Sequence, residues 1–346
     1  MKRLPIFYAI LAAVCYGISA PVAKLLLEKM SPTFMASMLY LGAGAGMIAI
    51  SLFRKQQTNE KEARITKKEL PYTIAMVILD IAAPIFLMIG LTMTTSATAS
   101  LLNNFEIVAT AIIALAAFKE AVGKRMWLAI AFITVSSVIL SVEDFSNLTF
   151  SVGAVFVLLA CVCWGVENNC TSRLSLKNPL HIVMIKGIGS GSGAFLIAML
   201  TGNGTANILY IAIALLLGFV AYGMSIYFYI LAQRNLGATR TSAFYAFAPF
   251  IGVGISFAIF RETPTISFVV ALVVMMIGAY LAAFEQHEHG HEHGEAEHDH
   301  RHSHSDGHHK HSHEPSIDVE HSHIHKHAPQ THIHAHLPDL HHTHSH

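Results

Sequence analysis

Apolar residues in this chain are grouped into ten long stretches separated by short polar connections. The stretches cover residues 4–27, 33–53, 71–91, 97–118, 126–142, 152–170, 180–200, 207–231, 240–260 and 266–284. Most of them hold the ~20 residues that a helix rising about 1.5 Å per residue needs to cross a ~30 Å hydrocarbon core. The pattern therefore predicts an all-α integral membrane protein with ten transmembrane helices embedded in a lipid bilayer.

The ten stretches fall into two related halves. Ala97–Glu120 aligns without a gap on Thr239–Glu262, and the pairs Phe118/Phe260 and Glu120/Glu262 are identical. Each half has five stretches, and two copies with an odd number of spans enter the bilayer in opposite senses. We therefore expect two inverted five-helix repeats, over residues 1–142 and 146–286, which is the plan of many secondary transporters.

Glycines and prolines within the stretches predict close packing and breaks. The triplets Gly42/Gly44/Gly46 and Gly189/Gly191/Gly193 contain the small-xxx-small spacing that lets helix backbones approach closely. Prolines inside spans would kink or break them, and such breaks are often found beside binding sites. The prolines concerned are Pro21, Pro84 and Pro249.

Basic residues are concentrated in alternate connections between the stretches. Residues 54–70 carry six of them, whereas the connections that should face the other side of the membrane hold only Lys29 and Arg261. Cytoplasmic loops carry the excess of Lys and Arg, so both termini are predicted to be cytoplasmic. The expected location is the cytoplasmic membrane, crossed several times.

Several short stretches resemble the drug/metabolite transporter superfamily, EamA type. They are Gly17-Ile-Ser-Ala-Pro-Val-Ala-Lys24, Thr98-Ala-Ser-Leu-Leu-Asn-Asn-Phe-Glu106, Trp164-Gly-Val-Glu-Asn-Asn169, and the Phe-Lys-Glu120 and Phe-Arg-Glu262 closures. The resemblance extends over nearly all of residues 4–284. It implies two inverted EamA-like five-helix repeats that move small solutes by alternating access, and it leaves the solute unnamed. Glu167 departs from the pattern, which would have Asp there, and Asp80 lies outside the pattern.

Four ionisable side chains are predicted to lie at bilayer depth, where each costs several kcal/mol unless it has a partner. They are Asp80, Glu106, Glu167 and Lys186. Glu106 is near the middle of its stretch and could bind a cation, bind a substrate amine or take up a proton. The alternative is a carboxylate held by hydrogen bonds for packing only. Lys186 could neutralise Glu167, bind an anion or extend toward the cytoplasmic interface.

Amides accompany two of these carboxylates. Asn103 and Asn104 precede Glu106, and in an unbroken helix Asn103 would share its face. Asn168 and Asn169 follow Glu167 directly. We take these four amides, together with the four ionisable residues, as candidates for a transport pathway.

Cysteines near Glu167 raise a second interpretation of that helix. Cys163, Glu167 and Cys170 are spaced four and then three residues apart, which places them on one helical face. Thiolates with a carboxylate suit a soft or borderline divalent metal. Free cysteines are also common as small apolar residues in helices, and this is the favoured interpretation here.

Residues 287–346 form a third region, a polar tail. All of the 24 histidines except His181 lie in it, many of them two residues apart. In an extended chain, side chains two residues apart point the same way, so each pair offers two imidazoles to one ion. Neutral imidazole suits Zn, Ni, Co and Cu. The candidate ligands are His287, His289, His291, His293, His298, His300, His302, His304, His321, His323, His325 and His327. The tail has no apolar face to bury, so composition predicts disorder without metal.

Motifs for nucleotide hydrolysis and for serine hydrolases are absent from the sequence, which has no G-x-x-x-x-G-K-[ST] or G-x-S-x-G. The H-E-x-x-H spacing occurs at His287–His291, within the alternating histidines of the polar tail. We therefore expect a secondary transporter rather than an enzyme, with no cofactor required for the fold and no nucleic-acid partner. The cargo is either an organic metabolite or a divalent transition metal. The competing hypothesis is a membrane-embedded metal sensor or scaffold without transport. A homodimer is left open.

Metal binding by the tail should weaken in acid. Imidazoles become protonated as the pH falls through about 6.5 and then no longer bind metal. Titration of the purified protein with Zn²⁺ should show several sites at pH 7.5 and few at pH 5.5. A chain truncated after Phe284 should lose those sites, and Zn²⁺ binding that survives the truncation would contradict the assignment to the tail.

Overall fold

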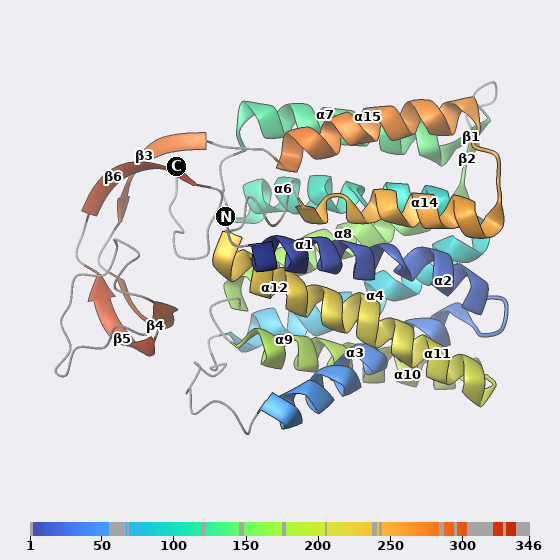
Figure 1. The fold of residues 1–346 in the computed structure, drawn as a ribbon, viewed down its shortest axis with the longest axis horizontal. Coiled ribbons are helices and arrows are strands. Elements are labelled where there is room, and N and C mark those ends of the chain that lie inside the picture. Colours follow the sequence, from blue (N-terminus) through green and yellow to red (C-terminus); the bar gives the residue numbers. More distant parts are fainter. Residues whose placement is uncertain are drawn as a thin grey trace.

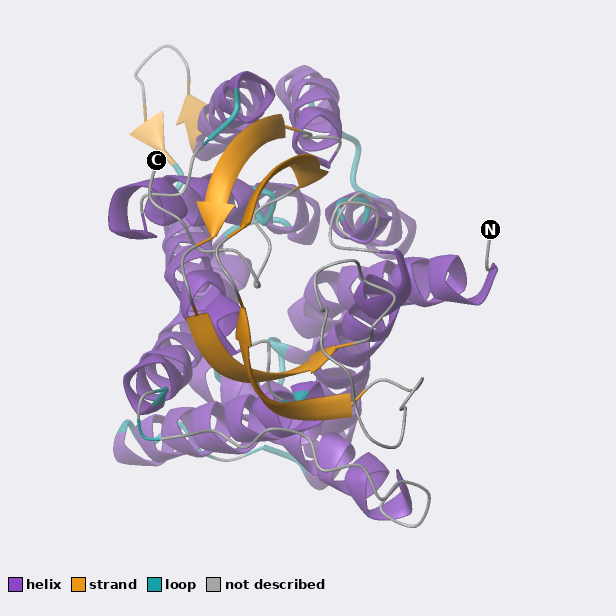
Figure 2. Ribbon diagram, turned by 90° about the vertical axis from the view of Figure 1, so that its left-hand side faces the viewer, coloured by secondary structure: helices purple, strands orange, loops and turns teal. Residues whose placement is uncertain are grey.

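The computed structural model describes residues 3–54, 67, 69–118, 122–144, 149–174, 178–204, 206–236, 241 and 244–283, together with the backbone of 287–293, 296–302, 321–327 and 330–336. Helices lie side by side in one bundle (Figures 1 and 2). They are α1 (Arg3–Gly17), α2 (Ser19–Leu26), α3 (Pro32–Arg54), α4 (Leu70–Met93), α5 (Ser96–Leu102), α6 (Phe105–Phe118), α7 (Lys124–Ser141), α8 (Val152–Leu174), α9 (Pro179–Ile185), α10 (Gly191–Leu200), α11 (Ile208–Gly218), α12 (Ser225–Leu236), α14 (Ala248–Phe260) and α15 (Ile266–Ala283). Two π-helices, η1 (Lys186–Ser190) and η2 (Phe219–Met224), join α9 to α10 and α11 to α12.

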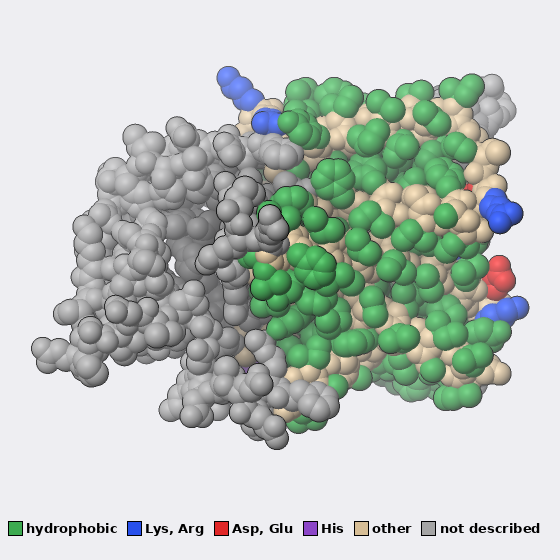
Figure 3. All heavy atoms as spheres, viewed as in Figure 1, with side chains coloured by type: hydrophobic (Ala, Val, Ile, Leu, Met, Phe, Trp, Pro, Cys, Tyr) green, Lys and Arg blue, Asp and Glu red, His purple; other side chains and the backbone are tan. Residues whose placement is uncertain are grey.

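Nine helices in the described part of the chain are long and apolar enough to cross a membrane. The stretch predicted at 240–260 instead contains α14, an apolar helix of 13 residues. Hydrophobic side chains cover the visible face of the bundle between its two ends (Figure 3). An integral membrane protein is therefore confirmed, and the exact number of ten spans stays a prediction.

Corresponding helices of the two halves keep the order and spacing that the sequence alignment predicts. The alignment that pairs Ala97 with Thr239 also pairs the first residues of α7 and α15, and the two helices have the same length. α3 and the segment from α9 to α10 both begin at a proline, Pro32 and Pro179. In the same order, the segment from α11 to α12 in the second half corresponds to α4 in the first half. α8 corresponds to α1 and α2. The helix bounds thus follow the repeat found in the sequence.

Spans that correspond to each other, the fourth with the ninth and the fifth with the tenth, pack in opposite directions. Ser96 on α5 donates a 2.8 Å hydrogen bond to Ser256 on α14, and further along α5 Ser100 lies against Gly252. Residue numbers rise along one helix as they fall along the other, so the two helices are antiparallel. The pair α7 and α15 shows the same order, because Ser136 donates to the Ala271 carbonyl at 2.7 Å and Gly278 lies against Ile133.

Breaks in the spans follow the predicted prolines only in part. Pro249 lies in the first turn of α14, directly after a break, but Pro84 lies within an uninterrupted α4. The first span is interrupted at Ile18, before Pro21, and the fourth is interrupted at Asn103 and Asn104, where no proline is present. The amide and carbonyl groups of this last turn bond to neighbouring turns, which satisfies them locally inside the bilayer.

Short two-stranded sheets complete the described structure. β1 (Val142–Asp144) pairs with β2 (Thr149–Phe150) in the connection between the halves. In the tail, β3 (His287–His293) pairs with β6 (Gln330–His336), and β4 (Ala296–His302) pairs with β5 (His321–His327), all antiparallel (Figure 2). Alternating histidines have the two-residue period of a strand, and disorder of the tail without metal stays a prediction. Their side chains lie outside the described residues, so metal binding there stays a prediction.

Glycines allow α3 and α11 to approach closely. A Cβ added at Gly42 would lie 2.0 Å from the Leu215 carbonyl oxygen, and one added at Gly218 would lie 2.0 Å from that of Leu39. The predicted role of the glycine triplet on α3 in close helix packing is thus confirmed at Gly42.

Gly42→Ala should therefore destabilise the folded protein, because the methyl group forces two backbones apart. Overpacking of this kind costs about 1–3 kcal/mol. Gly254→Ala is the matched control, since nothing lies within 4 Å of a Cβ added there. Thermal denaturation of the detergent-solubilised protein should show a lower midpoint for Gly42→Ala than for Gly254→Ala, and equal midpoints would contradict the packing argument.

Candidate functional site

The break in the fourth span positions Glu106. The turn at Asn103 and Asn104 ends α5, and α6 begins at Phe105, so Glu106 lies in the first turn of a half-helix. The N-terminus of a helix favours a negative charge. The half-buried Glu106 side chain accepts a 2.6 Å hydrogen bond on Oε1 from Nδ2 of Asn168 on α8. The same Nδ2 atom lies 3.3 Å from Oγ1 of Thr110, one turn further along α6.

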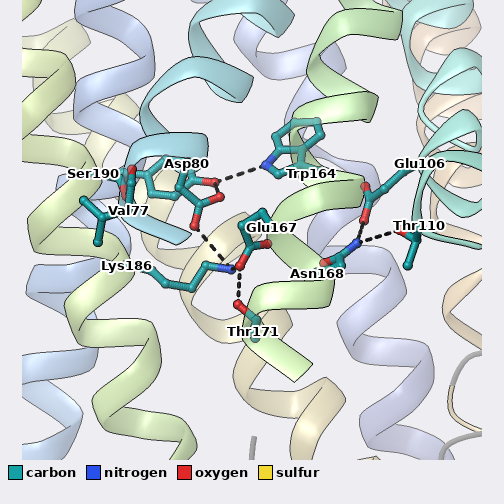
Figure 4. Close-up of polar contacts among 11 residues, drawn as sticks. Val77, Asp80, Glu106, Thr110, Trp164, Glu167, Asn168, Thr171, Lys186 and Ser190 are labelled. Carbon is teal, nitrogen blue, oxygen red and sulfur yellow. Dashed lines mark hydrogen bonds and ion pairs between the residues drawn. The ribbon is translucent and has the colours of Figure 1, made fainter. Parts of the chain in front are cut away.

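A charged triad lies on the other side of α8 (Figure 4). The ammonium of Lys186 is 2.8 Å from Oε1 of Glu167 and 3.3 Å from Oδ2 of Asp80. Asp80 is completely buried and Glu167 is 1% exposed. Of the alternatives for Lys186, the structure therefore supports neutralisation of Glu167, and it adds Asp80 as a second partner.

Neighbouring hydrogen bonds hold the triad in place. Tyr40 on α3 donates a 2.9 Å hydrogen bond to Oδ1 of Asp80, and Trp164 on α8 donates to the Tyr40 hydroxyl at 3.4 Å. Thr171, one turn beyond Glu167, donates to Oε1 of that carboxylate. Lys186 is the first residue of the π-helix η1, and π-helical turns are frequent at functional sites.

Three of the predicted amides contact backbone carbonyls or a thiol rather than the charged side chains. Asn103 lies at the break before Glu106, whose backbone amide donates to the Asn103 carbonyl at 3.1 Å, and its Oδ1 lies 4.0 Å from the thiol of Cys161. Asn104 donates to the Leu101 carbonyl at 3.3 Å and so bonds back to α5. Asn169 donates to the carbonyls of Gly165 and Thr110, which joins α8 to α6.

Cys163 and Cys170 are not grouped with other metal ligands in the described structure. Among the residues that the structure describes, no group of three His, Cys, Asp or Glu side chains is placed to hold a metal ion. Glu167 is paired with Lys186 instead, and this ammonium lies where a cation between the two carboxylates would be. Cys161 and Cys170 are buried and Cys163 is partly buried, as expected for small apolar residues.

A second lysine contacts the backbone rather than a carboxylate. Lys24, on α2, donates to the carbonyls of Leu91 and, at 2.9 Å, of Thr94. These carbonyls lie at the C-terminal end of α4, where a cation is favourable. Lys24 therefore connects the broken first span to the end of the third.

Comparison with known proteins identifies the chain at family level. The model of the EamA-like transporter family matches it twice, over residues 3–142 and 151–284. The chain belongs to the EamA-like transporter family. The matched residues include the fourth span with Glu106 and the whole charged triad, so both polar groups lie inside the transporter body.

Similar proteins in other organisms are also described as transporters. An uncharacterized transporter of Methanothermobacter thermautotrophicus is 28% identical over 299 residues, covering 81% of this chain and 87% of its own length. The uncharacterized transporter YyaM of Bacillus subtilis is 25% identical over 299 residues, covering 82% of this chain and 95% of its own. One crystal structure superposes with a TM-score of 0.59 at 15% identity, covering 80% of this chain and 95% of the other, and supports the fold alone. The chain is thus a multi-pass membrane protein of a transporter family.

Sequence reasoning missed several of the side chains that hold these groups. Tyr40, Thr110, Trp164 and Thr171 carry the hydrogen bonds to the carboxylates and their partners. Thr171 could have been found, because it lies four residues after Glu167 on the same helical face. Tyr40 could not, because nothing in its own stretch indicates that it faces Asp80.

Lys186→Met should strongly destabilise the protein, because it leaves two buried carboxylates without a counter-ion. Breaking a buried ion pair from one side costs about 3–5 kcal/mol. Glu167→Gln added to the same chain should recover part of this loss by removing a buried charge that no longer has a counter-ion. Thermal or urea denaturation of the reconstituted variants measures both effects, and a Lys186→Met variant as stable as the parent would contradict the ion pairing.

Proposed function

We propose that this protein is a secondary transporter that moves a small solute across the cytoplasmic membrane by alternating access of two inverted five-helix repeats. The observation that carries the proposal is the antiparallel packing of α5 on α14 and of α7 on α15. A twofold axis in the membrane plane relates elements that run in opposite directions. The two matches to the EamA-like model support the same division of the chain.

The contacts between helices also support a twofold relation between the two repeats. α4 packs on α8, and in the corresponding positions of the other half α12 packs on α1. α6 packs on α8, and correspondingly α14 packs on α1. Each contact has a counterpart in which the roles of the halves are exchanged, as a twofold relation requires. We propose repeat boundaries of 1–142 and 146–286, with 287–346 as a separate tail.

Both termini are proposed to be cytoplasmic. α1 begins and α15 ends at the same end of the bundle (Figure 1), so the start of the first repeat and the end of the second share one side of the membrane. The excess of basic residues in the connection at 54–70 assigns that side to the cytoplasm. The tail that follows α15 would then meet cytoplasmic metal.

An organic solute is the favoured cargo over a metal ion. The described spans hold no group of three metal-binding side chains, and the two most buried carboxylates, Asp80 and Glu167, are already paired with Lys186. Glu106 differs from them, because it is half-buried and its described hydrogen bonds involve only Oε1. A carboxylate with an adjacent amide and hydroxyl suits the hydrogen-bonding groups of a small organic molecule.

The histidine tail is proposed to bind divalent transition metal and to regulate the transport activity rather than to carry the cargo. Its histidines and the spans are separated by residues 284–286, and the tail carries few apolar residues with which to dock on the bundle. A metal sensor without transport is the alternative, and it predicts that no solute is moved.

Glu106→Gln tests the proposal at its candidate contact with the solute. Growth of a deletion strain across a panel of metabolites and metals identifies a solute that the parent protein moves. The variant should then lower transport of that solute by ~10-fold or more, because a neutral amide cannot replace a carboxylate that binds or exchanges a charge.

Glu28→Gln, at an exposed carboxylate beyond α2, is the matched control and should transport normally. Equal insertion of both variants is checked by fractionation. A Glu106→Gln protein that transports like the parent would show that the carboxylate is structural. A parent protein that moves nothing in the panel would favour the sensor.

A further inference from the structure

We propose that Asp80, Lys186 and Glu167 form a proton-binding site, in which Asp80 takes up the proton while Glu167 remains the counter-ion of Lys186. The proposal names the coupling ion of the proposed transporter and rests on that function for its role. Proton binding itself can be measured whether or not the protein transports anything.

The formal charge of the triad favours the uptake of one proton. Two carboxylates and one ammonium leave a formal charge of −1 when all three are ionised. Both carboxylates are almost completely removed from solvent, and only 11% of the Lys186 side chain is exposed. An uncompensated charge in the bilayer interior is costly, and uptake of one proton makes the triad neutral.

The hydrogen bonds identify which carboxylate takes the proton. Oε1 of Glu167 accepts from both Lys186 and Thr171, and such donors stabilise an ionised carboxylate. Asp80 accepts one hydrogen bond, from Tyr40 on Oδ1. Its Oδ2 is buried and has no hydrogen-bond donor among the described residues, with the ammonium of Lys186 3.3 Å away. Oδ2 of Asp80 is therefore the atom at which a proton binds.

The surroundings of Asp80 hold few other groups that could take the proton. α3 contributes Tyr40, α8 contributes Glu167 and the Trp164 ring, and η1 contributes Lys186. Tyr222 of η2 packs against the Tyr40 ring, 5.4 Å between centroids. Glu106 lies on the opposite side of α8 and bonds to Asn168 (Figure 4).

Protonation would loosen contacts between the two halves of the chain. Asp80 and Tyr40 belong to the first half, whereas Glu167 and Lys186 belong to the second. When the Asp80 carboxylate accepts a proton from the aqueous side, its attraction to the ammonium falls to that of a neutral group, while the pair of Lys186 and Glu167 remains. A contact between the halves then depends on the proton, which is what coupling to a gradient requires.

Infrared difference spectroscopy of the full-length protein in lipid, with aspartate labelled by ¹³C, tests the site. Asp80 is the one aspartate between residues 1 and 298 apart from Asp144, which lies in the connection between the halves. Aspartates in water titrate near ~3.9. The parent protein should show a label-sensitive band of a protonated carboxylic acid at neutral pH, where aspartates in water show none.

Substitutions separate this band from other groups. Asp80→Asn should remove it, and Glu106→Gln should leave it in place. Glu167→Gln should move its appearance by about one pH unit or more toward acid, because Asp80 is then the sole counter-ion of Lys186. Tyr40→Phe should move it toward alkaline pH, since the ionised carboxylate loses its hydrogen bond. The last two variants keep the test valid if Asp80→Asn fails to fold.

A labelled band that persists in Asp80→Asn, or that is absent from the parent protein between pH 5 and 8, would overturn the proposal. An unchanged band in both Glu167→Gln and Tyr40→Phe would also overturn it. The expected band in a protein that moves no solute would leave the proton site standing and refute the transport function, so the two proposals fail separately.

Discussion

Ionised side chains inside a bilayer cost several kcal/mol each unless they are paired, and this cost organises the interior of the protein. Lys186 lies between Asp80 and Glu167, and each of these three residues comes from a different span. Their contact is possible only if α4, α8 and η1 meet at one depth. The glycines that bring α3 close to α11 and to η1, and the serine hydrogen bonds between neighbouring helices, therefore support a geometry that the charges require.

Hydrogen bonds extend this constraint to the aromatic residues. Tyr40 contacts Asp80 and packs on Tyr222, which in turn packs edge-on against Tyr16. These rings come from the second, eighth and first spans, so the charged group is linked through packed side chains to helices that do not touch it. A change in charge at the triad would be transmitted along a contiguous set of contacts, which is the physical route by which a local event alters helix packing.

Much of the fold could be predicted from the sequence, because hydrophobic stretches and their spacing depend on local composition. The sequence predicted spans at 126–142 and 266–284, and the structure has α7 and α15 there. The position of Asp80, Glu106, Glu167 and Lys186 on helices of the bundle also followed from the apolar stretches that hold them. The break at Asn103 and Asn104 was not predicted, because prolines were expected to mark the breaks. The contact of Tyr40 with Asp80 depends on how α3 and α4 rotate against each other, and no pattern within either stretch fixes that rotation.

The two polar groups share one helix, and this arrangement connects them mechanically. Glu167 and Asn168 are adjacent on α8 and point to opposite sides, one into the triad and the other to Glu106 (Figure 4). α8 belongs to the second half of the chain but packs on α4 and α6 of the first, just as α1 packs on α12 and α14 of the second. Any sliding of α8 against its neighbours would change the distance from Glu167 to Asp80 and the distance from Asn168 to Glu106 together. The two proposed sites are thus linked through one helix, and a shift of α8 at one of them would also act on the other.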